Sequence, residues 1–257
     1  MRRTSSSKPE GPTASQTLLR KSSAPSVILY SVTKGRCDFA KNSFVAVTRQ
    51  RFLPQAHITP VRTGPGTRLK GKKVAIIAAH EFEDVELLYP FLRLSEEGAE
   101  VTIIPVPAGL HPRPAVPSKP VTGRYGTPIP LEVFGEGVRY VIKKLEDAKP
   151  EEFDAIVLPG GFSPDHLRVK KEVLEFVKRA HEAGKVIAAI CHGPQVLISA
   201  GLVKGRRVTA YEAVRDDLIN AGAIFVDEPA VRDGNIVTGR VPDDLPEFCR
   251  LIIEALS

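Results

Sequence analysis

The chain has 257 residues, enough for one large domain or two small ones, and its charge is unevenly distributed. Residues 1–70 carry 13 Lys and Arg against two acidic residues, whereas residues 71–257 carry 23 Lys and Arg against 28 acidic residues. The net charge of +6 therefore comes from the first segment. Because residues 71–257 are mildly acidic, the overall positive charge is no reason to expect that they bind nucleic acid.

The cysteines limit the compartment and the chemistry. Cys37, Cys191 and Cys249 are too few and too scattered for a disulfide framework or a zinc site, which fits a reducing compartment. No apolar run reaches the roughly 18 residues that span a membrane. Neither a dinucleotide-binding glycine motif nor a P-loop occurs. We therefore expect a cytoplasmic protein with no membrane partner, no metal and no cofactor.

Residues 1–70 are basic and rich in Ser and Thr. This composition predicts a disordered tail, because the segment cannot bury enough apolar surface to become ordered. The same composition is typical of an organelle transit peptide, so import into an organelle is an alternative. A third interpretation places the true start of the protein near Leu69.

The globular part begins at Lys72 with a predicted strand–helix–strand unit. Lys73–Ala79 and Glu100–Val106 have the apolar runs of buried parallel strands. Between them lies a helix that ends at Gly98, with an apolar face made of Val85, Leu88, Leu92 and Leu94.

Residues 107–150 are less regular and predict an excursion out of the core sheet. The Pro-rich run from Pro105 to Pro120 is followed by predicted hairpin strands, and Val138–Leu145 fits either a strand or a short helix. We expect this β excursion to serve as a lid or as an oligomer contact.

The rest of the chain again alternates strands with helices. Phe153–Leu158 and Val186–Ile190 are predicted core strands, with a helix from Ser163 to about Ala183 between them. Shorter elements follow: strands at Arg207–Ala210, Ala223–Val226 and Val231–Thr238, the last turned at Asp233-Gly234, and helices at Tyr211–Ala221 and after Asp243 or Asp244. This order predicts a doubly wound, flavodoxin-like α/β fold, with a mostly parallel sheet sandwiched by helices.

Ligands of such sheets bind where the strands end, and three turns at that edge carry reactive residue types. They are His80–Asp84, Pro159–Phe162 and Cys191–Gly193. Cys191 directly follows a buried strand and precedes a helix, as the nucleophile does in the elbow of G-x-S-x-G enzymes. The helix N-terminus favours a thiolate there.

The neighbouring turns offer partners for that thiolate. Glu83 is a candidate acid–base group or a hydrogen-bond partner of the thiol, and the amides of Gly160-Gly161 and His192 are candidates for an oxyanion hole. Each also has a purely structural explanation: Glu83 as a partner of the helix dipole, and the glycines and His192 as turn residues. The motif at His80–Asp84 lacks the second His of a zinc protease.

Six stretches together resemble the PfpI family of the class I glutamine-amidotransferase-like superfamily. They are EFEDVE (81–86), VTGRYG (121–126), VLPGG (157–161), SPDHLR (163–168), AAICHGPQVLISAG (188–201) and RDDLINAGA (215–223). The resemblance covers residues 72–256, so that residues 71–257 form the family domain and residues 1–70 lie outside it.

The resemblance implies roles for single residues. Cys191 matches the family nucleophile, His192 its adjacent histidine, and Glu83 the glutamate that hydrogen-bonds the thiol. Asp165 stands where the family places the acidic member of a triad that is completed by a neighbouring subunit, so a homo-oligomer is implied.

Three functions follow from this reasoning. We expect first a cysteine-dependent hydrolase or lyase that acts on methylglyoxal or its protein adducts, as a deglycase or a glutathione-independent glyoxalase. The second is an oligomeric intracellular cysteine peptidase with a peptide substrate. The third is a non-enzymatic redox or stress sensor in which Cys191 is oxidised.

Overall fold

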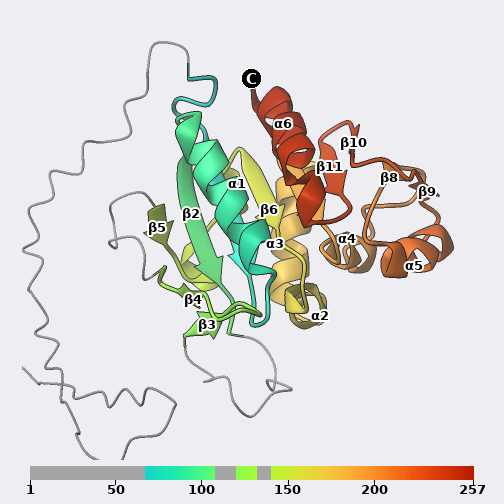
Figure 1. The fold of residues 1–257 in the computed structure, drawn as a ribbon, viewed down its shortest axis with the longest axis horizontal. Helices are drawn as coiled ribbons and strands as arrows, with labels where there is room; N and C mark the ends of the chain where they lie inside the picture. Colours follow the sequence, from blue (N-terminus) through green and yellow to red (C-terminus); the bar gives the residue numbers. More distant parts are fainter. Residues whose placement is uncertain (1–66, 108–119, 132–139) are drawn as a thin grey trace, which may run out of the picture. The chain divides into compact units, whose positions relative to one another are not determined.

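The computed structural model describes residues 67–107, 120–131 and 140–257 (Figure 1). The predictions for the basic tail fall on residues outside them, except for its last few positions, and most of the Pro-rich run also falls outside.

A seven-stranded sheet forms the centre of the fold, with the strand order β10-β11-β7-β6-β1-β2-β5. All neighbouring strands are parallel except β10, which is antiparallel to β11. The strands are β1 (Lys73–Ala78), β2 (Glu100–Pro105), β5 (Tyr140–Ile142), β6 (Ala155–Leu158), β7 (Val186–Ile190), β10 (Ala230–Asp233) and β11 (Ile236–Gly239). Counted along the chain, the five inner strands have the flavodoxin-like order, which confirms the predicted fold class.

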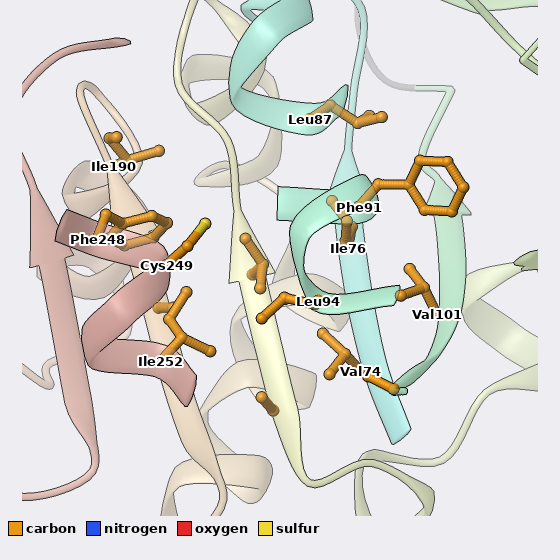
Figure 2. Packing of buried hydrophobic residues seen from close by; sticks show 14 of the residues in the cluster. Val74, Ile76, Leu87, Phe91, Leu94, Val101, Ile190, Phe248, Cys249 and Ile252 are labelled. Carbon is orange, nitrogen blue, oxygen red and sulfur yellow. The ribbon is translucent and has the colours of Figure 1, made fainter. Parts of the chain in front are cut away.

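Helices cover both faces of this sheet, which is why its strands are apolar on both faces. On one face α1 (Asp84–Glu96) packs beside α6 (Leu245–Leu256), and their apolar side chains meet Val74 and Ile76 of β1 (Figures 1 and 2). On the other face Ala75 and Ile77 meet a second cluster. It is built by α2 (Ser163–Leu167), α3 (Lys171–Glu182), α4 (Pro194–Ser199) and α5 (Arg215–Asn220).

The buried face of α1 differs from the predicted one. Val85 and Leu92 are 40% and 41% exposed, whereas Leu87, Phe91 and Leu94 are fully buried (Figure 2). Of the predicted face, Leu94 is fully buried and Leu88 packs against the core, so packing against α6 and the sheet shifts the buried stripe of the helix without replacing it. This change of phase decides which acidic side chain of α1 turns inward.

The excursion after β2 only partly leaves the sheet. β3 (Val121–Thr122) and β4 (Pro128–Ile129) form a separate antiparallel hairpin, as expected. Residues Tyr140–Ile142, however, form β5 and pair with β2 at the edge of the main sheet, so the excursion does not extend to residue 150. Two short 3₁₀ helices follow, η1 (Leu145–Asp147) and η2 (Pro150–Glu152).

Three further predictions need correction. The helix expected from Ser163 to Ala183 is broken into α2 and α3, because Lys170 adopts an extended conformation between them. The strands β8 (Arg207–Val208) and β9 (Ile224–Phe225) form a parallel pair of their own, and η3 (Glu212–Val214) precedes α5. The β10–β11 turn is centred on Gly234-Asn235 rather than on Asp233-Gly234, and η4 (Pro242–Asp244) leads into α6.

None of the helices in the described residues is both long enough and apolar enough to cross a membrane.

Candidate active site

The turns that follow β1, β6 and β7 meet at one edge of the sheet. β1 and β6 are neighbours on either side of the point where the strand order reverses, which is where doubly wound sheets bind ligands. An isolated antiparallel bridge joins Phe82 to Gly161, and the Phe162 N–H donates to the Glu81 carbonyl at 2.9 Å. The first two turns are therefore tied together through backbone hydrogen bonds.

Cys191 lies at the sharp turn between β7 and α4. It has a φ of 60°, which is unusual for a residue with a side chain. Its N–H donates to the Gly239 carbonyl at 3.0 Å, and its own carbonyl accepts from the Tyr211 N–H at 3.0 Å. These bonds hold the residue in the geometry of a nucleophile elbow.

Gly160 lets the Cys191 turn approach the loop after β6. A Cβ atom on Gly160 would lie 2.6 Å from the Cys191 Cβ and 2.7 Å from Glu86 Oε2. Both contacts are far shorter than van der Waals distance, so a side chain at this position would push the cysteine and the glutamate away.

The Cys191 sulfur receives two backbone hydrogen bonds. Burial raises the pKa of the thiol to about 12, and the negative charge of Glu86 acts in the same direction, whereas the N–H groups of Gly161 and His192 lower it. The Gly160 N–H does not donate to the sulfur, because it donates to Glu86 Oε2 at 2.7 Å. The pair of donors at the sulfur is thus Gly161 and His192, the arrangement of an oxyanion hole.

Glu86 is the carboxyl group that faces the thiol. It is fully buried, and burial raises its pKa to about 7. Oε2 accepts a hydrogen bond from the Gly160 N–H, and hydrogen bonds from Gly160 and from the Cys191 side chain oppose the rise in the pKa of the carboxyl. Near neutral pH this carboxyl exchanges its proton readily, and protonation removes the charge that opposes ionisation of Cys191.

Glu83 does not take the place predicted for it. Its Oε2 accepts a hydrogen bond from Arg124 Nη1 at 3.0 Å, and the carboxyl that acts on the thiol is that of Glu86. The predicted contact between Glu83 and the thiol is therefore corrected to Glu86. The signal was the face of α1: Glu86 stands one turn before Pro90, on the same buried side as Leu87.

His192 lies beside the thiol, with Nδ1 3.3 Å from the Cys191 sulfur. Burial lowers the pKa of the imidazole, and the charge of Asp165 opposes this effect. Asp165 of the same chain is thus within electrostatic range, although no hydrogen bond joins it to His192 in the described structure. The ring of His192 packs against Tyr211, with centroids 5.1 Å apart.

Arg124 lies beside the site, close enough for its charge to act on Glu86 and His192, and the sequence predicted no role for it. It belongs to the turn between β3 and β4, which wraps around Asp84 at the start of α1. The Asp84 carboxylate accepts hydrogen bonds from the N–H groups of Tyr125 and Thr127, both at 2.9 Å. A Cβ atom on Gly123 would lie 2.5 Å from this carboxylate, which explains the glycine in that turn.

An open groove of about 970 Å³ lies away from Cys191. Pro105, Pro150 and Phe176 are among the residues that line it, and none of its lining residues belongs to the three turns. Within the described ranges, no group of three His, Cys, Asp or Glu side chains could hold a metal ion.

A family model described as the DJ-1/PfpI family matches residues 72–255. The chain belongs to the DJ-1/PfpI family. The match covers the whole of the sheet and the three turns, and it excludes all of residues 1–70.

Relatives from several organisms match over the same region. The "Deglycase PfpI" of Pyrococcus furiosus is 40% identical over 185 residues, which are 72% of this chain and 99% of that protein. The "Putative cysteine protease YraA" of Bacillus subtilis is 41% identical over 186 residues, which are 72% of this chain and 99% of that protein. Names of both kinds support an enzyme.

Solved structures share the fold. A two-domain protein of Anabaena variabilis, with a DJ-1/ThiJ/PfpI-like and a ferritin-like domain, matches with a TM-score of 0.60 and 36% identity. The match covers 72% of this chain but 48% of that protein, so the chain spans about half its length. DJ-1beta of Drosophila melanogaster matches with a TM-score of 0.58 and 26% identity, covering 72% of this chain and 90% of that protein.

Proposed function

We propose that the chain is a cysteine-dependent hydrolase or lyase of the deglycase or glyoxalase type, acting on methylglyoxal or its protein adducts. The observation that carries this proposal is the buried carboxyl of Glu86, with a pKa of about 7, beside a cysteine that receives two N–H donors. A nucleophile and a proton carrier at one carbon are what the isomerisation of a dicarbonyl compound needs. The relatives named deglycases point the same way.

The reaction on methylglyoxal begins at its aldehyde carbon. The Cys191 sulfur bonds to this carbon, the carbonyl oxygen takes up a proton, and a hemithioacetal forms. The N–H groups of Gly161 and His192 stabilise the charge that develops on this oxygen. Glu86 then removes the proton from the carbon attached to sulfur and returns it to the neighbouring carbon, while the hydroxyl proton of the first carbon passes to the oxygen of the second, which yields a lactoyl thioester. Water cleaves the thioester and releases lactate and the free thiol.

The test is an assay of lactate formation from methylglyoxal by the full chain. We expect Cys191→Ala to lower the rate by about a thousandfold or more, because the covalent step is lost. Cys249→Ala is the matched control, since this cysteine is fully buried in α6. Lactate formation that survives in Cys191→Ala, or that is absent from the wild type, contradicts the proposal.

A peptidase that works as a homo-oligomer is the second candidate. The observation that favours it is the distance of 3.3 Å between the Cys191 sulfur and His192 Nδ1, the pairing of a cysteine protease. Asp165 is exposed on α2 and makes no hydrogen bond to His192 of its own chain in the described residues. In this candidate His192 is oriented by an acidic residue across a subunit contact.

The two candidates separate in one pair of assays. A peptidase cleaves casein, loses this activity in Asp165→Asn and loses it again when the oligomer is dissociated. A glyoxalase keeps most of its lactate formation in Asp165→Asn, because the proposed proton transfer runs through Glu86 and not through His192.

A further inference from the structure

The side chain of Arg124 has three contacts beside the site, with Glu83, Phe162 and Tyr125. Its Nη1 donates to Glu83 Oε2 at 3.0 Å. Its guanidinium carbon lies 5.5 Å from the ring centre of Phe162 and 5.9 Å from that of Tyr125. Both distances are within the range of cation–π interaction, so these contacts restrict the position of the guanidinium group.

This place is next to the reacting groups. Phe162 directly follows Gly161, whose N–H donates to the Cys191 sulfur. The backbone N–H of Arg124 donates to the Phe82 carbonyl at 3.0 Å, and Phe82 is bridged to Gly161. The positive charge of Arg124 also acts on Glu86 and on His192, the two side chains that flank the sulfur.

The guanidinium has unused binding capacity. An arginine offers five N–H donors in a planar fork, and within the described residues the Arg124 side chain has one hydrogen-bond acceptor, Glu83. Its side chain is 36% exposed, whereas that of Glu83 is 11% exposed. Glu83 therefore holds the guanidinium from the protein side, and the Arg124 side chain is partly open to solvent. A carboxylate is the partner that matches such a fork, because two parallel hydrogen bonds can form.

We propose that Arg124 forms a carboxylate subsite in this active site, and that it selects electrophiles which carry a carboxylate on the attacked carbon or on the next one. The subsite rests on the proposed function only in that Cys191 is the nucleophile. Methylglyoxal is neutral, so with this substrate the subsite acts on the lactate that is released. Among aldehydes, it favours an oxo acid over a neutral dicarbonyl of the same size.

Alkylation of Cys191 tests the subsite without any turnover assay. Iodoacetate and iodoacetamide bring the same carbon to the sulfur, which displaces iodide in both cases, but only iodoacetate carries a carboxylate. The measurement is the ratio of the two rate constants at Cys191 in the full chain, followed on its peptide by mass spectrometry. Dividing the rates cancels changes in the exposure and in the pKa of the thiol.

We expect Arg124→Gln to lower this ratio by about fivefold, the effect of one solvent-accessible charge pair. Arg124→Lys keeps the charge but loses the fork, so its ratio falls between those of the wild type and Arg124→Gln. Arg250→Gln is the matched control, because Arg250 is a half-exposed arginine on α6 with carboxylate partners of its own. A ratio that is unchanged in Arg124→Gln, or that falls equally in Arg250→Gln, overturns the proposal.

Glu83→Gln keeps the proposal testable if Arg124→Gln fails to fold, which alkylation of the buried Cys249 would reveal. This variant leaves Arg124 in place and removes the carboxylate that competes with the ligand, so the ratio must rise. A ratio at or below the wild-type value overturns the subsite.

The outcomes also separate the subsite from the proposed function. A ratio that depends on Arg124 in a protein that forms no lactate supports the subsite and contradicts the glyoxalase. Lactate formation with a ratio independent of Arg124 does the reverse.

Discussion

Two cysteines in this fold have nearly the same burial effect and very different surroundings. Burial raises the thiol pKa to about 12 both for Cys191, at the end of β7, and for Cys249, in α6. Cys249 lies in the apolar cluster beside Phe248 and Ile252 (Figure 2). Cys191 has two N–H donors, an imidazole and a carboxyl group around its sulfur. Burial alone produces an inert thiol, and the polar groups at the strand ends supply what a nucleophile needs.

The largest effect on lactate formation is expected from removing the ionisable carboxyl group beside Cys191, a group that Cys249 lacks. Glu86→Gln still accepts the hydrogen bond from Gly160 but cannot carry a proton. We expect lactate formation to fall by about 100- to 1000-fold, the size of general acid–base catalysis. Glu83→Gln is the matched control and should cost less than about tenfold. A larger loss in Glu83→Gln than in Glu86→Gln would restore the assignment made from the sequence.

The second prediction concerns pH and stability. The folded state raises the pKa of Glu86 from 4.5 to about 7, so between these values the unfolded chain releases this proton before the folded one. The free energy of unfolding therefore falls as pH rises through this window, by up to about 3 kcal/mol, and this contribution is constant above it. Glu86→Gln lacks the contribution, so its stability relative to the wild type should increase from pH 4.5 to pH 7. Urea unfolding of both proteins across the window measures this, and a constant difference contradicts it.

The smallest expected effect is a difference in the free energy of unfolding between serine variants of the two cysteines. Cys249→Ser places a hydroxyl in an apolar cluster and should cost about 1–3 kcal/mol. Cys191→Ser places the same hydroxyl where Gly161 and His192 offer N–H donors, so its cost should stay below about 1 kcal/mol. Midpoints of urea unfolding at one pH compare the two variants. Equal costs would show that the two surroundings are energetically alike.

The parts of the fold that could be predicted are those with strong local patterns. The strands β1, β2, β6 and β7 are short apolar runs between charged or turn residues, and their alternation with helices is enough for a parallel sheet. The short edge strand β5 could not be assigned, because three residues carry no reliable period and its partner β2 is distant in the chain. Its pairing is decided by tertiary contact.

The site was predictable to the same extent. Cys191 follows a buried strand and precedes a helix, so a local pattern was sufficient to find it. Glu86 was missed because α1 has apolar residues on two stripes, and only its contact with α6 shows which stripe is buried. Arg124 belongs to a hairpin about forty residues after Glu83, its hydrogen-bond partner, and no local sequence pattern encodes this contact.

Asp84 has a consequence for how this enzyme can change. Its carboxylate anchors the turn that carries Arg124 to the first residue of α1, two positions before Glu86. The turn that carries Arg124 and the start of the helix that carries Glu86 are therefore joined through one carboxylate. Side chains at positions 124 and 125 can be exchanged without loss of these two hydrogen bonds, because Asp84 accepts them from backbone N–H groups of the turn. A different side chain at position 124 would thus change what meets the ligand of the proposed subsite and leave the place of Glu86 on α1 unaltered.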